Sequence, residues 1–484
     1  MTDDLAFLDA TAQAELVERG DLTPLDLVDA AINRVEKVNP ELNAVIHPLF
    51  DRARAAARGD LPPGPFRGVP AVVKDLDGSS AGDPSHLGNR LLKAVAWTDD
   101  HDSYLFAKLR AAGFVFVGKT NTPELGLQPT TEPLSHGPTR NPWDTGRGPG
   151  GSSGGSATAV AAGMVPVGHA GDGGGSIRIP ASACGIFGLK PSRGRVSLGP
   201  DAGESWAGMV QRHVVTRSVR DSAAVLDAVA GEMPGDPYTA PPPVRPFAHE
   251  VGADPGKLRI GLRTNAPGDM VDVHPDCVAA AEDAARLLES LGHTVDAGSP
   301  APLDEPDLMG MFMTIISTWV VKDLEEIACR AGREVGPDDV EPLTWAYAEM
   351  GRTHSGVQYV NAVNAMHAWS RRAAAWWTPA EGDGHDLLLT PTMAEPPPLL
   401  GDLVPPADNP LHGAARATPF ATFTAPFNVT GQPAMSVPLQ WSGDGLPVGA
   451  QLVAASGRED VLIRVASQLE TARPWADRRP PVHA

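Results

Sequence analysis

Apolar residues recur every three or four positions between residues 5 and 38, a spacing that predicts two amphipathic helices. Thr23 comes directly before Pro24, and a threonine cap followed by proline in the first helical turn predicts that the second helix begins there. Short apolar runs follow at residues 43–49 and 69–73. Because runs of this length between helical patterns are typical of buried strands, the amino-terminal part is expected to mix helices with strands.

Helical and extended patterns continue to alternate further along the chain. Residues 102–112 have a helical pattern and precede the apolar run at 114–117. Residues 157–163 have a helical pattern and precede an extended pattern at 164–167. Such alternation is typical of βαβ units, in which helices cover both faces of a sheet. The fold class is therefore expected to be α/β, with a mixed or parallel sheet between two layers of helices.

The second half of the chain adds a long helical stretch. Prolines concentrate at residues 234–251, which makes this segment the best candidate for an exposed loop. Because neither a clear linker nor an internal repeat interrupts the chain, residues 1–484 are expected to form a single domain. The elements expected after the loop are a strand at 257–262, a helix at 277–291, a strand at 293–295, helices through 308–377, a strand at 386–391 and strands within 428–454 that rejoin the first sheet.

Length and charge exclude several classes of function. The chain has 484 residues, of which 42% are hydrophobic, enough to bury a large core. Its formal net charge of -20 argues against nucleic acid as a partner, because phosphate backbones require clustered Lys and Arg. The acidic amino terminus lacks the basic and apolar regions of a signal peptide, and no apolar run is long enough to cross a membrane. These observations predict a cytoplasmic protein with no membrane partner.

Cysteine usage is sparse. Cys184, Cys277 and Cys329 are widely separated and form no CxxC pair. Neither a disulfide framework nor a zinc site is indicated by this spacing. We therefore expect a reducing compartment and neither a metal nor another cofactor.

Glycine and serine are concentrated in two short segments that could bind an anion. Residues 150–156 read GGSSGGS and include Ser152, and residues 173–176 read GGGS and end at Ser176. Consecutive glycines leave backbone N–H groups free to converge on a phosphate or on the oxyanion of a tetrahedral intermediate. A phosphate loop requires Lys and then Ser or Thr after the glycines, whereas Ile177 follows Ser176. The oxyanion interpretation remains, beside the alternative of purely structural loops.

An oxyanion site of this kind needs a nucleophile and a base that activates it. Ser176 can supply the nucleophile. Lys74 can supply the base, because it ends the apolar run at 69–73, where burial would lower the pKa of its amine. Ordinary ion pairing of Lys74 with Asp75 or Asp77 is the alternative, and the sequence alone leaves both interpretations open.

Four segments taken together resemble the amidase signature family. They are the strand end at Lys74, residues 150–156, residues 172–180 and residues 184–191, of which the last read CGIFGLKP. The resemblance implies a mixed, twisted sheet flanked by helices on both faces. It also implies hydrolysis of carbon–nitrogen amide bonds without a metal or a cofactor.

The resemblance further implies a role for each residue of the site. Ser176 matches the nucleophile, Lys74 the base, and Ser152 the serine that links them after a cis peptide bond. The nucleophile would form an acyl-enzyme through a tetrahedral oxyanion. The implied backbone donors to that oxyanion are Gly173, Gly174, Gly175 and Ser176, and the implied supporting residues are Ser153, Asp172 and Arg178. A solvated loop pair is the alternative for Asp172 and Arg178.

Substrate-binding residues carry weaker signals. Asn121 follows the run at 114–117, near where the family lines its cleft, and is expected to contact substrate. Ile316 and Trp319 lie in a strongly apolar part of the helical stretch 308–377 and are expected to line the cleft. Packing in the core is the alternative for both.

Two neighbours of the nucleophile are also informative. His169 lies seven residues before Ser176, but the sequence identifies no carboxylate to orient it, so a structural histidine is expected rather than a Ser–His mechanism. Gly171 occupies a position where the family commonly has a hydroxyl residue, which predicts a looser nucleophile loop.

The choice of amide rests on general likeness. Residues 9–17, 38–46 and 139–143 resemble the branch of the family whose enzymes open the cyclic dimer of 6-aminohexanoate. A small apolar cyclic or linear amide is therefore the expected substrate, and a homodimer is a family-level expectation. The alternatives are a general or peptide amidase, a glutamine-using transamidase subunit and a non-catalytic binding module.

Overall fold

A computed structural model describes residues 5–378, 384–406 and 409–484 of the chain. Its described strands form one eleven-stranded sheet. The strands are β1 (Val45–Pro48), β2 (Pro70–Lys74), β3 (Val115–Thr120), β4 (Val167–Asp172), β5 (Phe187–Lys190), β6 (Gln211–Thr216), β7 (Arg259–Leu262), β8 (Thr294–Ala297), β9 (Leu387–Pro391), β10 (Ala434–Trp441) and β11 (Pro447–Ala454).

The sheet is mixed. Its strand order is β1-β3-β2-β4-β6-β5-β10-β11-β9-β7-β8. Strand β2 is parallel to both β3 and β4, and β7 is parallel to both β8 and β9. The other pairs, including β5 with β10, are antiparallel. The pairing of β5 with β10 joins the carboxy-terminal strands to the amino-terminal half, as the sequence predicted.

Fifteen α-helices lie in the described part of the chain, with six short 3-10 helices between them. The α-helices are α1 (Ala10–Glu18), α2 (Pro24–Leu42), α3 (Phe50–Arg58), α4 (Arg90–Ala94), α5 (Tyr104–Ala111), α6 (Gly154–Ala161), α7 (Arg178–Cys184), α8 (Val219–Val229), α9 (Pro275–Ser290), α10 (Asp307–Ala331), α11 (Pro342–Arg352), α12 (Gly356–Ala374), α13 (His412–Ala421), α14 (Pro426–Val429) and α15 (Glu459–Ala472). The 3-10 helices are η1 (Glu124–Gly126), η2 (Phe247–Glu250), η3 (Pro267–Asp269), η4 (Ala301–Asp304), η5 (Pro337–Asp339) and η6 (Ala375–Trp377).

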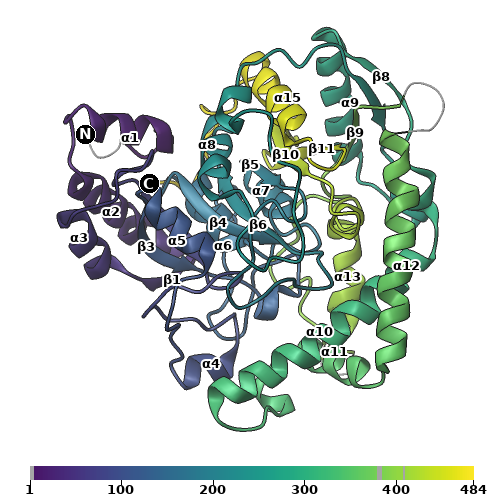
Figure 1. The fold of residues 1–484 in the computed structure, drawn as a ribbon, viewed down its shortest axis with the longest axis horizontal. Coiled ribbons are helices and arrows are strands. Elements are labelled where there is room, and N and C mark those ends of the chain that lie inside the picture. The colour runs from purple at the N-terminus through teal and green to yellow at the C-terminus, as the bar shows by residue number, and fades with distance from the viewer. Residues whose placement is uncertain (1–4, 379–383, 407–408) are drawn as a thin grey trace.

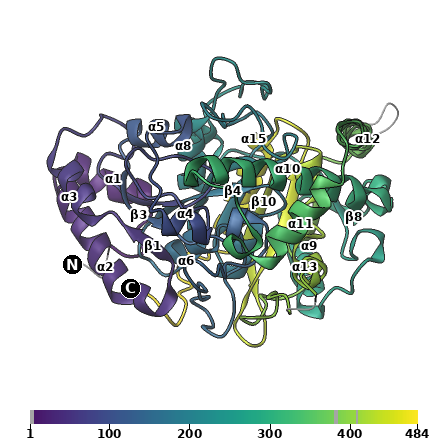
Figure 2. The same ribbon diagram turned by 90° about the horizontal axis from the view of Figure 1, so that it is seen from below.

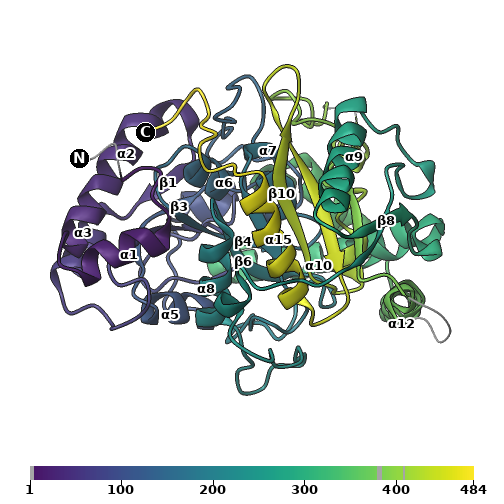
Figure 3. The same ribbon diagram turned by 90° about the horizontal axis from the view of Figure 1, so that it is seen from above.

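Helices cover both faces of the sheet because successive strand residues point to opposite faces. In β2, Val73 packs in a cluster with residues of α5, α8, α9 and α15, whereas Val72 packs in a second cluster with residues of α2, α3, α6 and α7. Figure 3 shows α15 alongside β10, with which it is in contact. The predicted α/β class, with helices on both faces, is confirmed.

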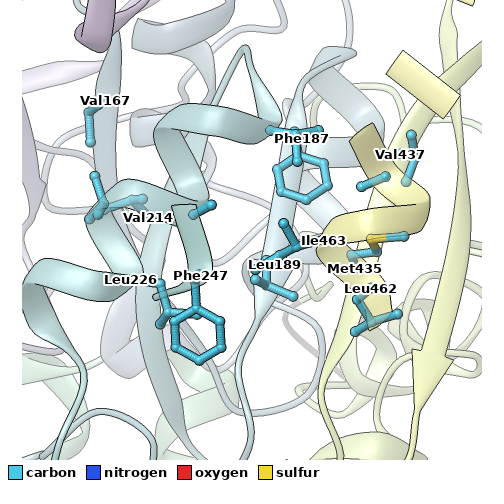
Figure 4. Close-up of a cluster of buried hydrophobic side chains, with 14 of the residues drawn as sticks. Val167, Phe187, Leu189, Val214, Leu226, Phe247, Met435, Val437, Leu462 and Ile463 are labelled. Atoms are coloured by element: carbon cyan, nitrogen blue, oxygen red, sulfur yellow. The ribbon is translucent and has the colours of Figure 1, made fainter. Parts of the chain in front are cut away.

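The first of these clusters forms a large core between the sheet and the helices of one face. Figure 4 shows Phe187 and Leu189 of β5, Met435 and Val437 of β10, and Leu462 of α15 directed toward one another. All five side chains are buried. Burial of apolar side chains of this size stabilises the folded state by roughly 1.5–3 kcal/mol each, before the loss of conformational entropy is counted.

A helical layer at the opposite end of the molecule from α1–α3 is formed by α10, α11 and α12 (Figure 1). Helix α10 packs against both α11 and α12, and Figure 2 shows α10 and α11 side by side. Their buried residues form a third cluster with Leu388 of β9 and Val453 of β11. The predicted helices within 308–377 are therefore confirmed.

Most predicted elements agree with the structure, including the second helix, whose N-cap is Thr23 with Pro24 in its first turn. The strand predicted at 164–167 is wrong, because β4 begins at Val167 and extends to Asp172. Glycine is rare in strands, and β4 contains Gly168 and Gly171, so the sequence pattern did not indicate its full extent. A Cβ on Gly168 would lie only 3.0 Å from the Ser156 Cβ, so close packing against α6 accounts for the glycine.

The segment 234–251 is only partly the exposed loop that was predicted. Val244 is fully exposed, but Phe247 and Glu250 in η2 are buried. The Phe247 N–H donates to Asp227 Oδ1 of α8 at 2.7 Å. The loop is therefore anchored at its carboxyl end by an apolar side chain under α8 and α15.

Among the residues that the structure describes, no helix is long and apolar enough to span a bilayer. The three cysteines are all free, with Cys184 and Cys277 buried and Cys329 exposed.

Candidate active site

The predicted site residues meet near the carboxyl ends of two neighbouring parallel strands. Lys74 ends β2 and Asp172 ends β4. Ser176 lies in the turn between β4 and α7, and Ser152 lies just before α6. Carboxyl ends of adjacent strands are where α/β folds commonly place a ligand.

Lys74 is fully buried and contacts two side chains through its amine. The Nζ atom lies 2.8 Å from Ser152 Oγ and 2.8 Å from Asp77 Oδ2. Burial lowers the pKa of the Lys74 amine, while the negative charge of Asp77 opposes this effect. Lys74 thus has the contact with Ser152 that the proton-transfer interpretation requires, and it also has the ion pair with Asp77 that the alternative expected. Asp75 pairs with Lys119 instead, at 3.0 Å.

The Ser152 segment approaches its neighbours closely. The Gly151–Ser152 peptide bond is cis, as the resemblance implied. A Cβ on Gly151 would lie 2.3 Å from the Thr130 carbonyl oxygen, so only glycine fits there. The Ser153 hydroxyl bridges to Gly171, and the Ser153 N–H donates to the Ser176 carbonyl oxygen at 3.3 Å. These contacts join the two glycine–serine segments.

Asp172 and Arg178 form a buried ion pair, not the solvated pair that was the alternative. Both side chains are fully buried, and Arg178 Nη2 lies 2.9 Å from Asp172 Oδ1. The arginine holds the pKa of the Asp172 carboxyl down at about 2, against the opposing effect of burial. Asn428 of α14 donates to the same carboxylate at 2.8 Å. Removing one partner of such a pair typically costs roughly 3–5 kcal/mol, because the other charge stays buried.

The backbone N–H groups of the glycine turn before Ser176 differ in whether they have a hydrogen-bond partner. The Gly175 N–H donates to Asp172 Oδ1 at 2.7 Å and is therefore engaged within the protein. Among the described backbone hydrogen bonds, none uses the N–H of Gly173, Gly174 or Ser176. Of the four predicted donors, Gly175 therefore orders the turn, and the N–H groups of the other three have no described backbone partner.

Ser176 lies where two pockets of opposite character meet. A polar pocket of about 190 Å³ is lined by Ser152 and Ser176, and an apolar pocket of about 400 Å³ is lined by Gly174 and Ser176. Gly126 and Trp206 also line both pockets. A small molecule bound at Ser176 can therefore extend from a polar to an apolar environment.

The polar pocket is rich in carboxylates. Its charged lining residues are Asp77, Asp99, Asp201, Glu204, Arg212, Lys322, Asp323, Glu326 and Arg330. Burial raises the pKa of the Asp323 carboxyl to about 7. This lining favours polar or cationic groups over apolar ones.

The apolar pocket is built largely from helices of the second half. Four residues of α10 line it, together with two from α11 and several small residues of α13. They are Met309, Phe312, Met313 and Ile316 from α10, Tyr347 and Met350 from α11, and Ala414, Ala415, Ala417, Thr418 and Ala421 from α13. The residues of α11 and α13 were not predicted, because a lining alanine or tyrosine has no signal that separates it from a core residue.

The three predicted substrate-binding residues have different outcomes. Ile316 lines the apolar pocket and Trp319 the polar one. Asn121 does not line the cleft as predicted, because it is fully buried and lines neither pocket. Its amide donates to the Gly137 carbonyl at 2.9 Å and to Thr139 Oγ1 at 3.0 Å, so it holds a loop in place.

Two neighbours of the nucleophile turn explain its shape. His169 is buried in β4, where its Nδ1 accepts the Lys74 N–H at 3.3 Å, and burial holds the pKa of its imidazole well below the usual value. Gly171 leaves room for Asp77, since a Cβ there would lie 2.1 Å from Asp77 Oδ2. The looser loop predicted from Gly171 is not what the structure shows, because both backbone groups of Gly171 bond to Ser153.

In the described residues one group of side chains is arranged so that it could hold a metal ion. It consists of His47, Asp75, His86 and His136, and these residues line neither of the two pockets.

Comparison with known proteins identifies the class to which this fold and site belong. The amidase family model matches residues 26–463. The chain therefore belongs to the amidase signature family, whose members hydrolyse carbon–nitrogen amide bonds. A solved structure of a bacterial aryl acylamidase of this family has a TM-score of 0.87 and 27% identity, with 98% of each chain covered.

One activity recurs among the most similar proteins. The 6-aminohexanoate-cyclic-dimer hydrolase of Paenarthrobacter ureafaciens is 44% identical over 479 residues, which are 98% of this chain and 96% of the relative. A solved structure of 6-aminohexanoate cyclic dimer hydrolase has a TM-score of 0.94 and 43% identity, with 99% of each chain covered. The likeness to this branch of the family, predicted from the sequence, is confirmed.

Proposed function

We propose that the chain hydrolyses amides through a Ser176–Ser152–Lys74 triad. The observation that carries the proposal is the contact of 2.8 Å between the amine of fully buried Lys74 and the hydroxyl of Ser152. A buried amine with a lowered pKa can be neutral near neutral pH, and a neutral amine can accept a proton. Ser152 and Ser176 line the same pocket, which supports a shared role at one substrate site.

Proton transfer would run through Ser152. Ser152 accepts the proton of the Ser176 hydroxyl and passes its own proton to neutral Lys74, while Ser176 Oγ attacks the amide carbon. The reverse transfer then protonates the leaving nitrogen, the carbon–nitrogen bond breaks, and an ester between Ser176 and the acyl group remains. Water, activated by the same relay, hydrolyses this acyl-enzyme and restores Ser176.

The turn before Ser176 would stabilise the tetrahedral intermediate. The N–H groups of Gly173, Gly174 and Ser176 are the available donors, since Gly175 donates to Asp172. Donors held in place before the reaction stabilise a developing oxyanion without reorganisation, and one such donor is typically worth roughly 3–4 kcal/mol. The Asp172–Arg178 pair and Ser153 would act indirectly by fixing this turn.

The proposed substrate is the 6-aminohexanoate cyclic dimer or a similar small apolar amide. Its methylene chains match the apolar pocket, which Phe312, Met313 and Ile316 of α10 help to line beside Ser176. The polar pocket on the other side of Ser176 suits the second amide and the amine released by ring opening. The relatives described above support the same choice.

Hydrolysis of the cyclic dimer by wild type and by the Ser176→Ala variant tests this function. We expect ring opening by the wild type and its loss by at least about a thousandfold in the variant, with a similar loss in Ser152→Ala. Ser290→Ala, an exposed serine at the end of α9, is the matched control and should retain full activity.

Assays with other amides test the proposed substrate separately from the proposed triad. An aryl amide, an amidated peptide and glutamine are assayed beside the cyclic dimer, and the acyl-enzyme is sought by intact mass spectrometry. Ser176-dependent cleavage restricted to one of the comparison substrates would replace the proposed substrate but keep the triad. Undiminished ring opening by Ser176→Ala would refute the triad itself.

A further inference from the structure

Three histidines and a carboxylate gather beside the carboxyl end of β2, and none of the four lines either substrate pocket. His47 belongs to edge strand β1, and Asp75 follows directly after β2. His86 and His136 come from two loops that are far apart in the sequence. Asp75, His86 and His47 are buried, at 0%, 7% and 9% exposure, while His136 is half-buried and lies nearest to solvent.

The four side chains point at a common centre. One ligand atom from each lies within 4.8 Å of all the others. His86 Nδ1 and His136 Nε2 are 3.3 Å apart, and His47 Nε2 and Asp75 Oδ2 are 3.6 Å apart. Around a tetrahedral Zn²⁺ with bonds of about 2.0–2.1 Å, the ligand atoms are about 3.4 Å apart. These two separations are therefore close to those of a tetrahedral site, and the other pairs, which lie within 4.8 Å, would shorten on binding.

One of these atoms has no hydrogen-bond partner within the described residues. His47 Nε2 is buried without one, although Asp75 Oδ2 lies 3.6 Å away. An unpartnered buried polar atom carries a free-energy cost, which a bound ion would relieve. The His47 ring lies nearly perpendicular to the rings of His86 and His136, so the three do not form one flat stack.

The charges around the centre set the kind of ion. Asp75 is the one carboxylate of the cluster; its Oδ1 lies 3.0 Å from Lys119 Nζ, and both of its oxygens accept the His86 N–H. A single carboxylate, which also pairs with an ammonium, supplies too few oxygen ligands for Ca²⁺ or Mg²⁺. Three imidazoles favour a late first-row divalent metal instead.

We propose that His47, His86 and His136, with Asp75 Oδ2 as fourth ligand, form a structural Zn²⁺ site. The ion would tie the edge strand β1 and two loops to the end of β2, next to Lys74 but separate from the substrate pockets. None of the four proposed ligands belongs to the proposed triad, so the metal site can be tested independently of the proposed function.

Cobalt titration of the purified full-length chain tests the proposal. The chain is freed of metal with EDTA, the chelator is removed, and Co²⁺ is added while the visible spectrum is recorded. We expect the intense ligand-field bands of tetrahedral Co²⁺, saturation at one equivalent per chain, and loss of the bands when Zn²⁺ is added. The melting temperature should rise on addition of Zn²⁺, because an ion that binds only the folded state stabilises it.

Two variants locate the ion. His136→Ala, at the half-buried position, and His47→Leu, inside the cluster, should each weaken Co²⁺ binding by at least about tenfold. His385→Ala is the matched control, since His385 also lies beside a carboxylate, Asp296, and contacts none of the four residues. Melting of each variant in EDTA verifies folding.

Two results would overturn the proposal. One is a wild-type chain that gives neither tetrahedral bands nor a higher melting temperature, in which case the histidines are packing and hydrogen-bonding residues only. The other is binding of equal strength in the wild type and in both cluster variants, which would place the metal elsewhere on the chain.

Discussion

At the scale of single residues, the environment of Lys74 depends on two neighbours whose roles are linked. Asp77 lies within hydrogen-bond distance of the Lys74 amine, and Gly171 is the residue that leaves room for Asp77. Burial lowers the pKa of Lys74, and the charge of Asp77 raises it again. The proton affinity of the proposed base is thus a balance of two opposed effects, and one of them can be removed by a single substitution.

Asp77→Asn should shift the acidic limb of the pH–activity profile to lower pH. The proposed mechanism requires neutral Lys74, so kcat/KM should fall as pH drops through the pKa of the amine. Without the carboxylate charge, the protonated amine loses a favourable interaction and its pKa falls further. The measurement is kcat/KM against pH for wild type and variant.

The half-exposed carboxylate Asp276 at the start of α9 provides the control for this experiment. Asp276→Asn changes the net charge by the same amount and should leave the limb in place. A limb that stays in place in Asp77→Asn, or moves to higher pH, would contradict the assignment of Lys74 as the base.

At the scale of elements, α10 shows how one helix serves two purposes. Ile315 is fully buried in the cluster shared with α11 and α12, whereas Phe312, Met313 and Ile316 line the apolar pocket. Residues three and four positions apart lie on one side of a helix, and such steps link Met309, Phe312, Met313 and Ile316 into the side of α10 that lines the pocket, next to the buried side that holds Ile315. The sequence showed an apolar helix but did not distinguish these two faces, because both are apolar.

Phe312→Ala should weaken binding of substrates that have methylene chains. Loss of the ring from the apolar pocket removes burial worth roughly 1.5–3 kcal/mol, which corresponds to a rise in KM of about tenfold or more for the cyclic dimer. A short amide that lacks such a chain should be affected much less. The measurement is the steady-state KM and kcat for both substrates.

An exposed apolar residue of α12 supplies the comparison for Phe312. Val357 is 70% exposed and lines neither pocket, so Val357→Ala should change no kinetic constant. Equal losses on the long and the short amide in Phe312→Ala would indicate a general disturbance of the site and would contradict the role of this pocket.

At the scale of the whole molecule, the sheet connects the parts that form the site. The residues of the proposed triad come from segments before residue 180, while much of the apolar pocket comes from α10, α11 and α13. Pairing of β5 with β10 makes the two halves share one sheet. We therefore propose that the chain is a single domain, in which neither half retains its structure when the other unfolds.

Urea unfolding should accordingly show one transition, with the same midpoint by far-UV circular dichroism and by tryptophan fluorescence. Coincidence is expected because α15 and β10 share one core with α8 and β5, so that loss of one half exposes the core of the other. Labelling of Ser176 by a fluorophosphonate should be lost at the same midpoint. Two separated transitions would show that the chain contains two independent folding units.

The sequence by itself determined the features that depend on local chemistry. The cap at Thr23–Pro24, the buried strand that ends at Lys74 and the glycine turn before Ser176 are all local, because they depend on the conformations that neighbouring residues allow. The amidase signature was recognisable for the same reason, since its motifs are short and continuous. Period-two alternation could also have indicated that Lys74 and Asp75 point to opposite faces of β2.

Only the tertiary structure decided which distant residues meet. It buried Asn121 against two loop residues, placed Ser176 between a polar and an apolar pocket, and brought His47, His86 and His136 together although no motif links them. These outcomes depend on strand register and on the packing of loops and helices across the sheet. Because such contacts form between segments far apart in the chain, no local pattern in the sequence encodes them.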